Sequence, residues 1–510
     1  MKPLAPSFPF KLCTCLLFFV TSVIGFSQNA PKKNEKSATP YQADWSSLQK
    51  HTTPDWLYGM KFGIYFHWGP QTVQVASKNP EMTVLEAVDA WKGENFDAKK
   101  WVDLIQDAGA QFGGPVAWHG SGVVNWDSDI TDWNSLNKGP KVDIYGSLAK
   151  ELRKRNMPII SSFHTGDFWS RMWGRLSKEN STYLDPYEDN SKYATANKGR
   201  TAEVIFQAWF DRISEAINKY EPDMIWFDTG FGGTVKGELK KYTDRGRLLP
   251  EGDNELISVP ESYQQKLIRD YFNKGLELGK EVEVFYKTHD IPPGIGIRDI
   301  EDGNLLGMQY DPWMADINMQ RHFEWPSPWF YNPANKVKEA GTLIDMLIDM
   351  TSKNGRMLLN VPPKADGSFP EETKKELYAM GDWLKINGEA IYNTMPWIFY
   401  GEGPTEVTNP GHHGQGKNRG ELIPKYTSED IRFTQNGKNL YAICMEWPGK
   451  QITIRTLGSK GKLYPGDIKN ISMLGCNESI KWEQKVEGLV VQFPKQKPCN
   501  FAYVLKIERR

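Results

Sequence analysis

The sequence predicts an α/β fold in which a parallel sheet flanked by helices is followed by a smaller antiparallel β domain. From about Trp45 to Pro396, helical and strand patterns alternate, which is typical of a parallel sheet, either closed as a (β/α)8-like barrel or open and doubly wound. After Trp397, short strand patterns follow one another without helices. A chain of 510 residues is long enough for two such domains.

Six apolar runs are the candidate strands of the parallel sheet, and amphipathic helical patterns lie between them. The strands are expected at 61–66, 114–117, 157–163, 224–227, 281–286 and 356–361. The helices are expected at 97–110, 143–156, 202–220, 262–279 and 336–352. No glycine-rich phosphate loop follows any of these strands, so the pattern gives no support for nucleotide binding.

The antiparallel domain begins with a hairpin pattern. Residues 431–434 and 440–445 flank Asn436-Gly437, a sequence that favours a type I′ turn. Further short strands are expected at 452–457, 468–474, 479–482, 489–493 and 501–507. The Gly-, Pro- and His-rich segment 401–425 is the candidate linker or loop. We therefore predict two domains, at 45–397 and 398–510.

Residues 1–28 are predicted to be a signal peptide. Lys2 and Lys11 precede an apolar stretch at 12–26, and small and polar residues follow it. The stretch is too short for a comfortable membrane span. We therefore expect export to the periplasm or the extracellular space, without stable membrane insertion. Residues 29–44 are expected to form a polar linker.

Composition excludes several kinds of partner. Because 62 Lys and Arg balance 63 Asp and Glu, no charge excess indicates nucleic acid or an anionic membrane. The 19 Trp residues offer flat apolar faces that suit sugar rings, although Trp more often packs in cores. Beyond the predicted signal peptide, Cys444, Cys476 and Cys499 allow at most one internal disulfide. No Cys and His residues have the spacing of a zinc site.

Polar and aromatic side chains follow the C-terminal ends of four predicted strands. His67 follows the first, Trp118-His119 the second, His164 the third and Asp228 the fourth. In a barrel, this end of the strands carries the chemistry. A single His or Asp at a strand end usually satisfies only local hydrogen bonds, but several at separate strand ends favour a common functional site.

A second acidic group is expected in the long loop after the strand at 281–286. Asp299, Glu301 and Asp302 lie close together there, and their spacing alone does not choose among them. Cleavage of a glycosidic bond needs two carboxyl groups, one to attack the anomeric carbon and one to protonate the leaving oxygen. Trp313 follows in what the pattern indicates is the same loop, and it is a candidate apolar wall of the site.

The chain resembles the α-L-fucosidases of glycoside hydrolase family 29 from about Trp56 to Ile507. The landmarks are the segments 61–69, 126–128, 131–134, 222–228, 298–301, 352–363, 366–367, 383–392 and 401–405. The resemblance implies a (β/α)8-like catalytic barrel followed by a β-sandwich. It also implies retaining hydrolysis of terminal α-L-fucosyl residues of glycans, without a metal or cofactor.

The resemblance assigns roles to the candidate residues. Asp228 matches the family's nucleophile, and Glu301 matches its acid/base. The residues expected to bind the sugar are His67, Trp118, His119, His164 and Trp313.

One segment departs from the family pattern. Relatives commonly carry two adjacent histidines followed by Asp-Gly-Phe, whereas this chain reads His119-Gly120-Ser121. Since the paired histidines hold sugar hydroxyls, the change leaves open an α-L-galactosidase or an enzyme active on sulfated fucans. A non-catalytic carbohydrate-binding protein or a structural surface protein is a further alternative, which the retention of Asp228 and Glu301 opposes.

Overall fold

The structure is a computed structural model. It describes residues 39–77, 79, 82–164, 202–228, 231–235, 241–242, 248–249, 256–287, 291–321, 329–407, 424–461 and 467–510. The predicted signal peptide lies outside these residues. Residues from Pro40 onward form one compact unit, and the backbone N–H of Tyr41 donates a hydrogen bond to Asn273 Oδ1 at 2.7 Å. The end of the predicted linker is therefore part of this unit.

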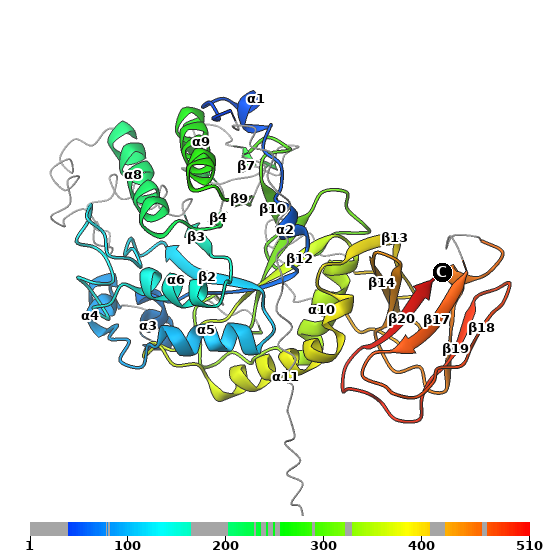
Figure 1. Ribbon diagram of the computed structural model, residues 1–510. Coiled ribbons are helices and arrows are strands. Elements are labelled where there is room, and N and C mark those ends of the chain that lie inside the picture. Colours follow the sequence, from blue (N-terminus) through cyan, green and yellow to red (C-terminus); the bar gives the residue numbers. More distant parts are fainter. Residues whose placement is uncertain are drawn as a thin grey trace, which may run out of the picture. The chain divides into compact units, whose positions relative to one another are not determined.

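Eight parallel strands close into a barrel (Figure 1), in the order β1-β12-β11-β10-β9-β4-β3-β2. Their bounds are β1 Phe62–Phe66, β2 Phe112–Trp118, β3 Ile160–His164, β4 Met224–Asp228, β9 Glu283–Tyr286, β10 Ile297–Asp299, β11 Trp313–Asn318 and β12 Gly355–Asn360. The barrel is thus confirmed, and the doubly wound alternative is wrong.

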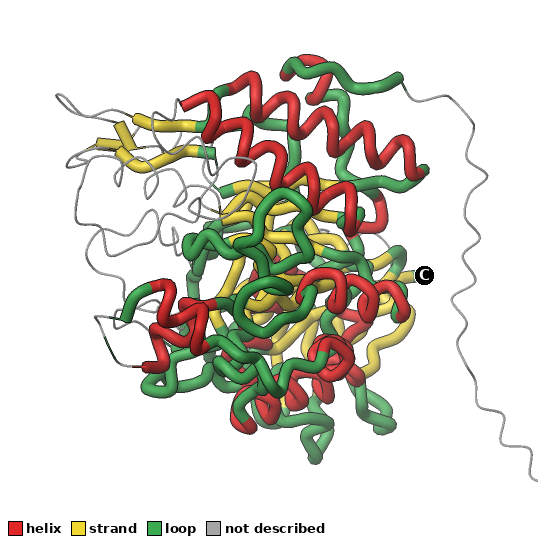
Figure 2. The backbone as a smooth tube through the Cα atoms, turned by 90° about the vertical axis from the view of Figure 1, so that its left-hand side faces the viewer, coloured by secondary structure: helices red, strands yellow, loops and turns green. Residues whose placement is uncertain are grey.

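Helices lie outside the barrel strands (Figure 2). They are α1 Trp45–Leu48, α2 Asp55–Tyr58, α3 Pro70–Ser77, α4 Val84–Ala90, α5 Ala98–Asp107, α6 Ile144–Lys154, α8 Ala202–Tyr220, α9 Glu261–Leu278, α10 Ala340–Ser352 and α11 Glu371–Asn387. Between β4 and α9, short strands pair as β5 Gly232–Val235 with β8 Leu256–Ser258, and as β6 Lys241–Tyr242 with β7 Leu248–Leu249. None of the helices among the described residues has the length and apolarity needed to cross a membrane.

Two barrel strands, β10 and β11, escape the sequence pattern, which treats their residues as loop. The described residues between β9 and β10, and between β10 and β11, form no helix. The helix–strand alternation that reveals the other strands is therefore missing here. In addition, β11 carries the buried Asp316 within its apolar run.

Side-chain alternation along the strands fills the barrel and directs polar groups to its C-terminal end. Met224 and Trp226 of β4 and Phe285 of β9 belong to the inner apolar cluster. Because successive side chains point to opposite faces, the residue two positions further along also faces inward. Asp228 and Lys287 follow this rule.

The C-terminal part contains two antiparallel sheets (Figure 1). Five strands pair in the order β13 Met395–Glu402, β14 Ile431–Asn436, β15 Asn439–Cys444, β20 Tyr503–Arg509 and β17 Ile468–Met473. Three others pair in the order β16 Gln451–Ile454, β19 Leu489–Gln492 and β18 Trp482–Gln484. The boundary predicted at 397/398 falls inside β13.

The five-stranded sheet is apolar on both faces. Along β15, Leu440 and Ala442 belong to the apolar cluster shared with the three-stranded sheet, whereas Tyr441 and Ile443 belong to the cluster of the barrel and its helices. The second face therefore packs against the barrel domain.

Two details of the C-terminal part refine the sequence interpretation. The predicted hairpin of β14 and β15 forms, but its two loop residues are Gly437 and Lys438, one position later than expected for a type I′ turn at Asn436-Gly437. Gly437 has a φ of 56°, which suits glycine. Cys444, Cys476 and Cys499 are free thiols, so Cys476 and Cys499 do not pair.

Candidate active site

Asp228 is the last residue of β4, and its carboxyl group is buried at the C-terminal end of the barrel. His164 occupies the matching position on the neighbouring β3. Its Nε2 atom lies 3.6 Å from Asp228 Oδ2. On the other side, Lys287 Nζ lies 2.6 Å from Asp228 Oδ1. The carboxylate is thus held between an imidazole and an ammonium group.

Lys287 is the residue that sequence reasoning missed. It directly follows β9 and is buried among four carboxyl groups. Its Nζ atom lies 2.6 Å from Asp228, 3.0 Å from Asp316, 3.1 Å from Glu301 and 3.9 Å from Asp299. The positional rule that predicts His67 and His164 also reaches Lys287, because all three lie at the C-terminal ends of barrel strands.

One ammonium group cannot compensate four buried carboxylates, and the pKa values show the consequence. Burial raises the pKa of Asp299 to about 7 and raises the pKa of Asp316 well above its usual range, although Lys287 opposes the shift. Burial would also raise the pKa of Asp228, but Lys287 and then His164 outweigh it and lower that pKa. The group therefore retains protons while Asp228 stays ionised.

The structure separates the three acids that sequence spacing leaves open. The side chain of Asp299 is 0% exposed, and its Oδ1 atom accepts the backbone N–H of Asp316 at 3.0 Å. Asp302 accepts the backbone N–H of Asn318 at 3.3 Å. The Glu301 side chain is 9% exposed and reaches Lys287. Of the three, Asp299 and Glu301 reach Lys287, which also contacts Asp228, and Glu301 is the more exposed of the two.

The carboxyl groups of Asp228 and Glu301 lie close together because both contact Lys287 Nζ. The contact distances of 2.6 and 3.1 Å place Asp228 Oδ1 and Glu301 Oε2 at most about 5.7 Å apart. Carboxyl groups about 5–5.5 Å apart suit attack by one of them on a sugar, whereas about 6.5–9.5 Å leaves room for a water molecule. The upper bound for this oxygen pair is compatible with the first arrangement.

Three predicted histidines form a row beside Asp228. The rings of His67 and His119 are 5.2 Å apart, and those of His119 and His164 are 4.0 Å apart. Asn360 Oδ1 accepts the backbone N–H of His67 and lies 3.1 Å from its Nδ1 atom. Gln71 Nε2 lies 3.2 Å from His119 Nδ1. Burial lowers the pKa of His67 to about 3, so this ring is neutral and can both donate and accept hydrogen bonds.

The aromatic walls differ from those predicted. The ring centres of Trp329 and His67 are 5.6 Å apart, and those of Phe330 and His119 are 4.9 Å apart. Trp226 lies beneath Lys287, whose Nζ atom is 5.0 Å from the ring centre. The aromatic run at 325–331 is the sequence signal that could have identified Trp329 and Phe330.

Trp118 and Trp313 are not brought to this group, so their assignment as walls is corrected. The pairing of β2 with β3 shifts between Val116 and Trp118. Trp118 therefore packs in the helix-facing layer, 5.6 Å from the guanidinium of Arg212 on α8. Trp313 is the first residue of β11, at the opposite end of the barrel, where its indole N–H donates to Lys353 O at 3.0 Å.

No group of three or more His, Cys, Asp or Glu side chains among the described residues is arranged to hold a metal ion. What the residues present offer is carboxyl, imidazole and ammonium chemistry. A parallel barrel that presents two close carboxyl groups beside polar and aromatic side chains is the architecture of a glycoside hydrolase.

The chain belongs to the alpha-L-fucosidase family. Residues 28–389 match the sequence model described as "Alpha-L-fucosidase", and residues 425–508 match that of the "Alpha-L-fucosidase C-terminal domain". Relatives include tissue alpha-L-fucosidases of Homo sapiens, at 24% identity over 92% of this chain and 91% of the relative, and of Rattus norvegicus, at 23% over 92% and 93%.

Solved structures share the fold. The alpha-fucosidase of Thermotoga maritima in complex with fucose has a TM-score of 0.66 and 23% identity, covering 92% of this chain and 100% of that chain. Alpha-L-fucosidase isoenzyme 1 from Paenibacillus thiaminolyticus has a TM-score of 0.60 and 18% identity, covering 89% and 98%.

Proposed function

We propose that this glycoside hydrolase is an exported, retaining α-L-fucosidase that removes terminal α-L-fucosyl residues from glycans. Asp228 is its nucleophile and Glu301 is its acid/base. The observation that carries the proposal is the contact of both carboxyl groups with Lys287 Nζ, at 2.6 and 3.1 Å. It supports a separation suited to a covalent glycosyl-enzyme intermediate.

The proposed reaction has two steps. First, the ionised Asp228 forms a bond to the anomeric carbon while the glycosidic C–O bond breaks and Glu301 gives its proton to the leaving oxygen. Then Glu301 takes a proton from water, whose oxygen bonds to the anomeric carbon and releases Asp228. Two inversions at one carbon leave the product with the configuration of the substrate.

Lys287 supports the first step electrostatically. A nucleophile must be ionised, and a buried carboxyl group resists ionisation. The ammonium group at 2.6 Å favours the charged form of Asp228, and the low pKa of Asp228 is consistent with this role.

His67, His119 and His164 are proposed to hold the sugar hydroxyls, with Trp329 and Phe330 as apolar walls. The row of three rings next to Asp228 supports this assignment. Since Gly120 stands where relatives commonly have a second histidine, an α-L-galactoside or a sulfated fucoside is the alternative substrate.

Export is proposed from the signal-peptide pattern of residues 1–28, with a periplasmic or extracellular glycan as substrate. N-terminal sequencing of the protein recovered outside the cytoplasm tests it. A mature N-terminus near residue 29 is expected, whereas an intact Met1 would contradict export.

The catalytic proposal is tested with 4-nitrophenyl α-L-fucoside and 4-nitrophenyl α-L-galactoside. We expect hydrolysis of the fucoside, with α-L-fucose as the first product seen by proton NMR before mutarotation. Initial release of the β-anomer would contradict retention. Hydrolysis of the galactoside alone would establish the alternative substrate, and activity on neither, nor on sulfated fucosides, would favour a binding protein.

A further inference from the structure

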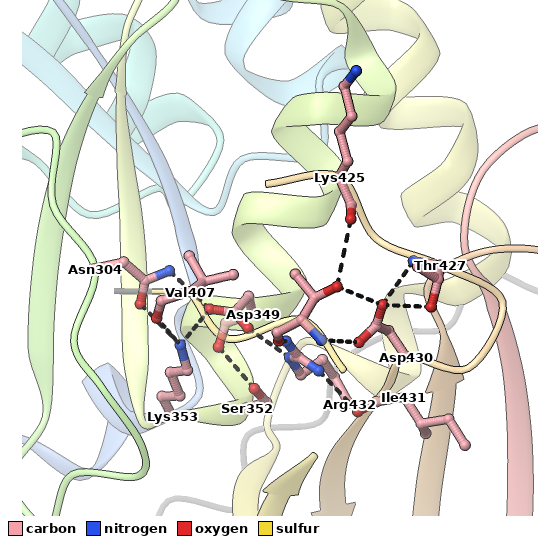
Figure 3. A network of polar contacts seen from close by, with 11 residues as sticks. Asn304, Asp349, Ser352, Lys353, Val407, Lys425, Thr427, Asp430, Ile431 and Arg432 are labelled. Atoms are coloured by element: carbon pink, nitrogen blue, oxygen red, sulfur yellow. Dashed lines mark hydrogen bonds and ion pairs between the residues drawn. The ribbon is translucent and has the colours of Figure 1, made fainter. Parts of the chain in front are cut away.

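We infer that the C-terminal β domain positions the acid/base through a buried relay of three side chains: Arg432 of β14 holds Asp349 of α10, and Asp349 holds Asn304 in the loop that carries Glu301. Figure 3 shows these three side chains converging. The inference rests on the proposed function, since it takes Glu301 as the acid/base.

Asp349 is the centre of the relay, and donors from three elements occupy its carboxylate. Arg432 Nε donates to Oδ1 at 2.5 Å. Lys353 Nζ donates to Oδ2 at 2.7 Å, and Asn304 Nδ2 donates to the same oxygen at 2.8 Å. All four side chains are buried. Because the polar atoms are enclosed, each must keep its partner or bear the cost of desolvation.

The segment from Ile300 to Pro312 is held by β11, by this anchor and by the residues that follow α10. The backbone N–H groups of Ile300 and Asp302 donate to the carbonyl groups of Met314 and Asp316, both at 2.9 Å, on either side of Glu301. Beyond them, Asn304 provides the first side-chain contact with α10. Leu306 is then 60% exposed and Tyr310 is 97% exposed. Further along, the backbone N–H of Gln309 donates to Lys353 O at 3.2 Å, and Asn354 Nδ2 donates to Tyr310 O at 2.9 Å, so Asn304 is the segment's side-chain link to Asp349.

Arg432 reaches the barrel because β14 alternates. Ile431 and Phe433 pack in the core of the two C-terminal sheets, so Arg432 points to the other face, toward α10. Its guanidinium also donates to Thr405 O at 3.0 Å and lies 5.5 Å from the ring centre of Tyr400. These contacts, with the hydrogen bond from Nη1 to Ile431 O at 3.1 Å, favour an orientation in which Nε meets Asp349.

The charge of Asp349 depends on Arg432. Burial would raise the pKa of Asp349, but Arg432 first and Lys353 second outweigh burial and lower it. Without Arg432, Lys353 is the remaining cation at this carboxylate among the described residues. We expect the Asp349 carboxylate to shift toward Lys353 in that case, and Asn304 to shift with it. That displacement would reach Glu301 three residues away.

The relay is tested with Asn304→Ala and Arg432→Met, and with Thr434→Val as a matched control. Thr434 lies on the same strand and donates to Ala390 O at 2.6 Å, without contact to Asp349. The measurement is kcat and KM on aryl α-L-fucosides whose leaving groups become steadily poorer. For both relay variants, we expect kcat/KM on the poorest leaving group to fall on the order of tenfold more than on the best. KM should change little.

Thr434→Val should keep the wild-type dependence on the leaving group, even if its melting temperature falls. Wild-type dependence in a folded Asn304→Ala variant would overturn the inference, and so would an equal change in Thr434→Val. If Arg432→Met does not fold, Arg432→Lys takes its place. Because lysine keeps the positive charge, this variant should show a smaller increase in the dependence of kcat/KM on the leaving group. Should Glu301→Gln itself leave the dependence unchanged, the proposed function fails rather than the relay.

Discussion

Two buried groups of charges in this molecule have opposite balance. Around Lys287, one cation meets four carboxyl groups. Around Asp349, one carboxylate meets two cations and an amide. The first group lies at the C-terminal end of the barrel strands, and the second lies where the barrel meets the C-terminal sheets.

The difference parallels the two proposed roles, catalytic for the group around Lys287 and structural for the group around Asp349. Near Asp349, the donors of Arg432, Lys353 and Asn304 all have acceptors, which favours one arrangement of these three side chains. Near Lys287, burial first and the neighbouring carboxyl groups second raise the pKa values of Asp299 and Asp316, although Lys287 opposes the shift, so protons remain in the site at neutral pH. A raised pKa also occurs near Asp349, at Asp345, so what sets the first group apart is the contact of Lys287 with both Asp228 and Glu301.

Removing the cation of the first group should give the largest effect. We expect Lys287→Met to lower kcat by at least about 10³-fold, because Asp228 loses the charge that keeps it ionised and both carboxyl groups lose their common anchor. Steady-state kinetics on 4-nitrophenyl α-L-fucoside measures the loss. Near-wild-type kcat would contradict the role of Lys287.

A second substitution separates activity from stability. Adding Asp316→Asn to Lys287→Met removes one uncompensated carboxyl group, so the melting temperature should rise above that of the single variant while activity stays absent. A double variant less stable than the single one would contradict the charge imbalance.

In the group around Asp349, removing a cation should lower the stability of the folded protein. Arg432→Met leaves a buried carboxylate with one cation fewer, which should lower the free energy of unfolding by about 3–5 kcal/mol. Thr434→Val removes one neutral hydrogen bond from the same strand and should cost about 1–3 kcal/mol. Chemical denaturation of both variants provides the comparison. Equal losses would mean that Asp349 does not depend on Arg432.

The proposed sugar-binding side of the first group is probed by Gly120→His, which restores the residue that the resemblance to the family gives as common at this position. We expect the ratio of kcat/KM for the α-L-fucoside to that for the α-L-galactoside or a sulfated fucoside to rise by on the order of tenfold. An unchanged ratio would show that position 120 does not set specificity.

The smallest effect concerns Asp345, at the edge of the second group. Burial, Glu446 and Asp349 raise its pKa to about 8 from the usual 3.8. The folded state thus keeps this proton up to about pH 8, whereas the unfolded chain releases it near pH 4, and stability falls as pH rises between these values. Asp345→Asn should therefore raise the melting temperature at pH 8 by about 2–4 °C and change it little at pH 4. The opposite pattern would contradict the shift.

Much of the fold can be predicted from the sequence, and the errors of that prediction have physical causes. Helix–strand alternation predicts six barrel strands, but β10 and β11 follow loops without helices among the described residues. The error at Trp313 has the same origin, since the segment after Glu301 descends to begin a new strand at the far end of the barrel.

The candidate site is predictable where a strand ends regularly. His67, His164 and Asp228 follow from that rule. Trp118 does not, because a register shift in β2 turns it toward α8 and directs His119 to the site. Lys287 obeys the rule too, but a lysine at a strand end usually means a solvated residue, and only the tertiary structure shows the four carboxyl groups around it.

The most direct test of the account is to trap the intermediate. Incubation with 2-deoxy-2-fluoro-α-L-fucosyl fluoride slows both steps and should leave a fluorofucosyl group on the nucleophile, which peptide mass spectrometry can locate. The account predicts the label on Asp228. A label on Asp299, Glu301 or Asp316 would contradict it. Hydrolysis of the fluorosugar by this protein without any labelled peptide would contradict it as well.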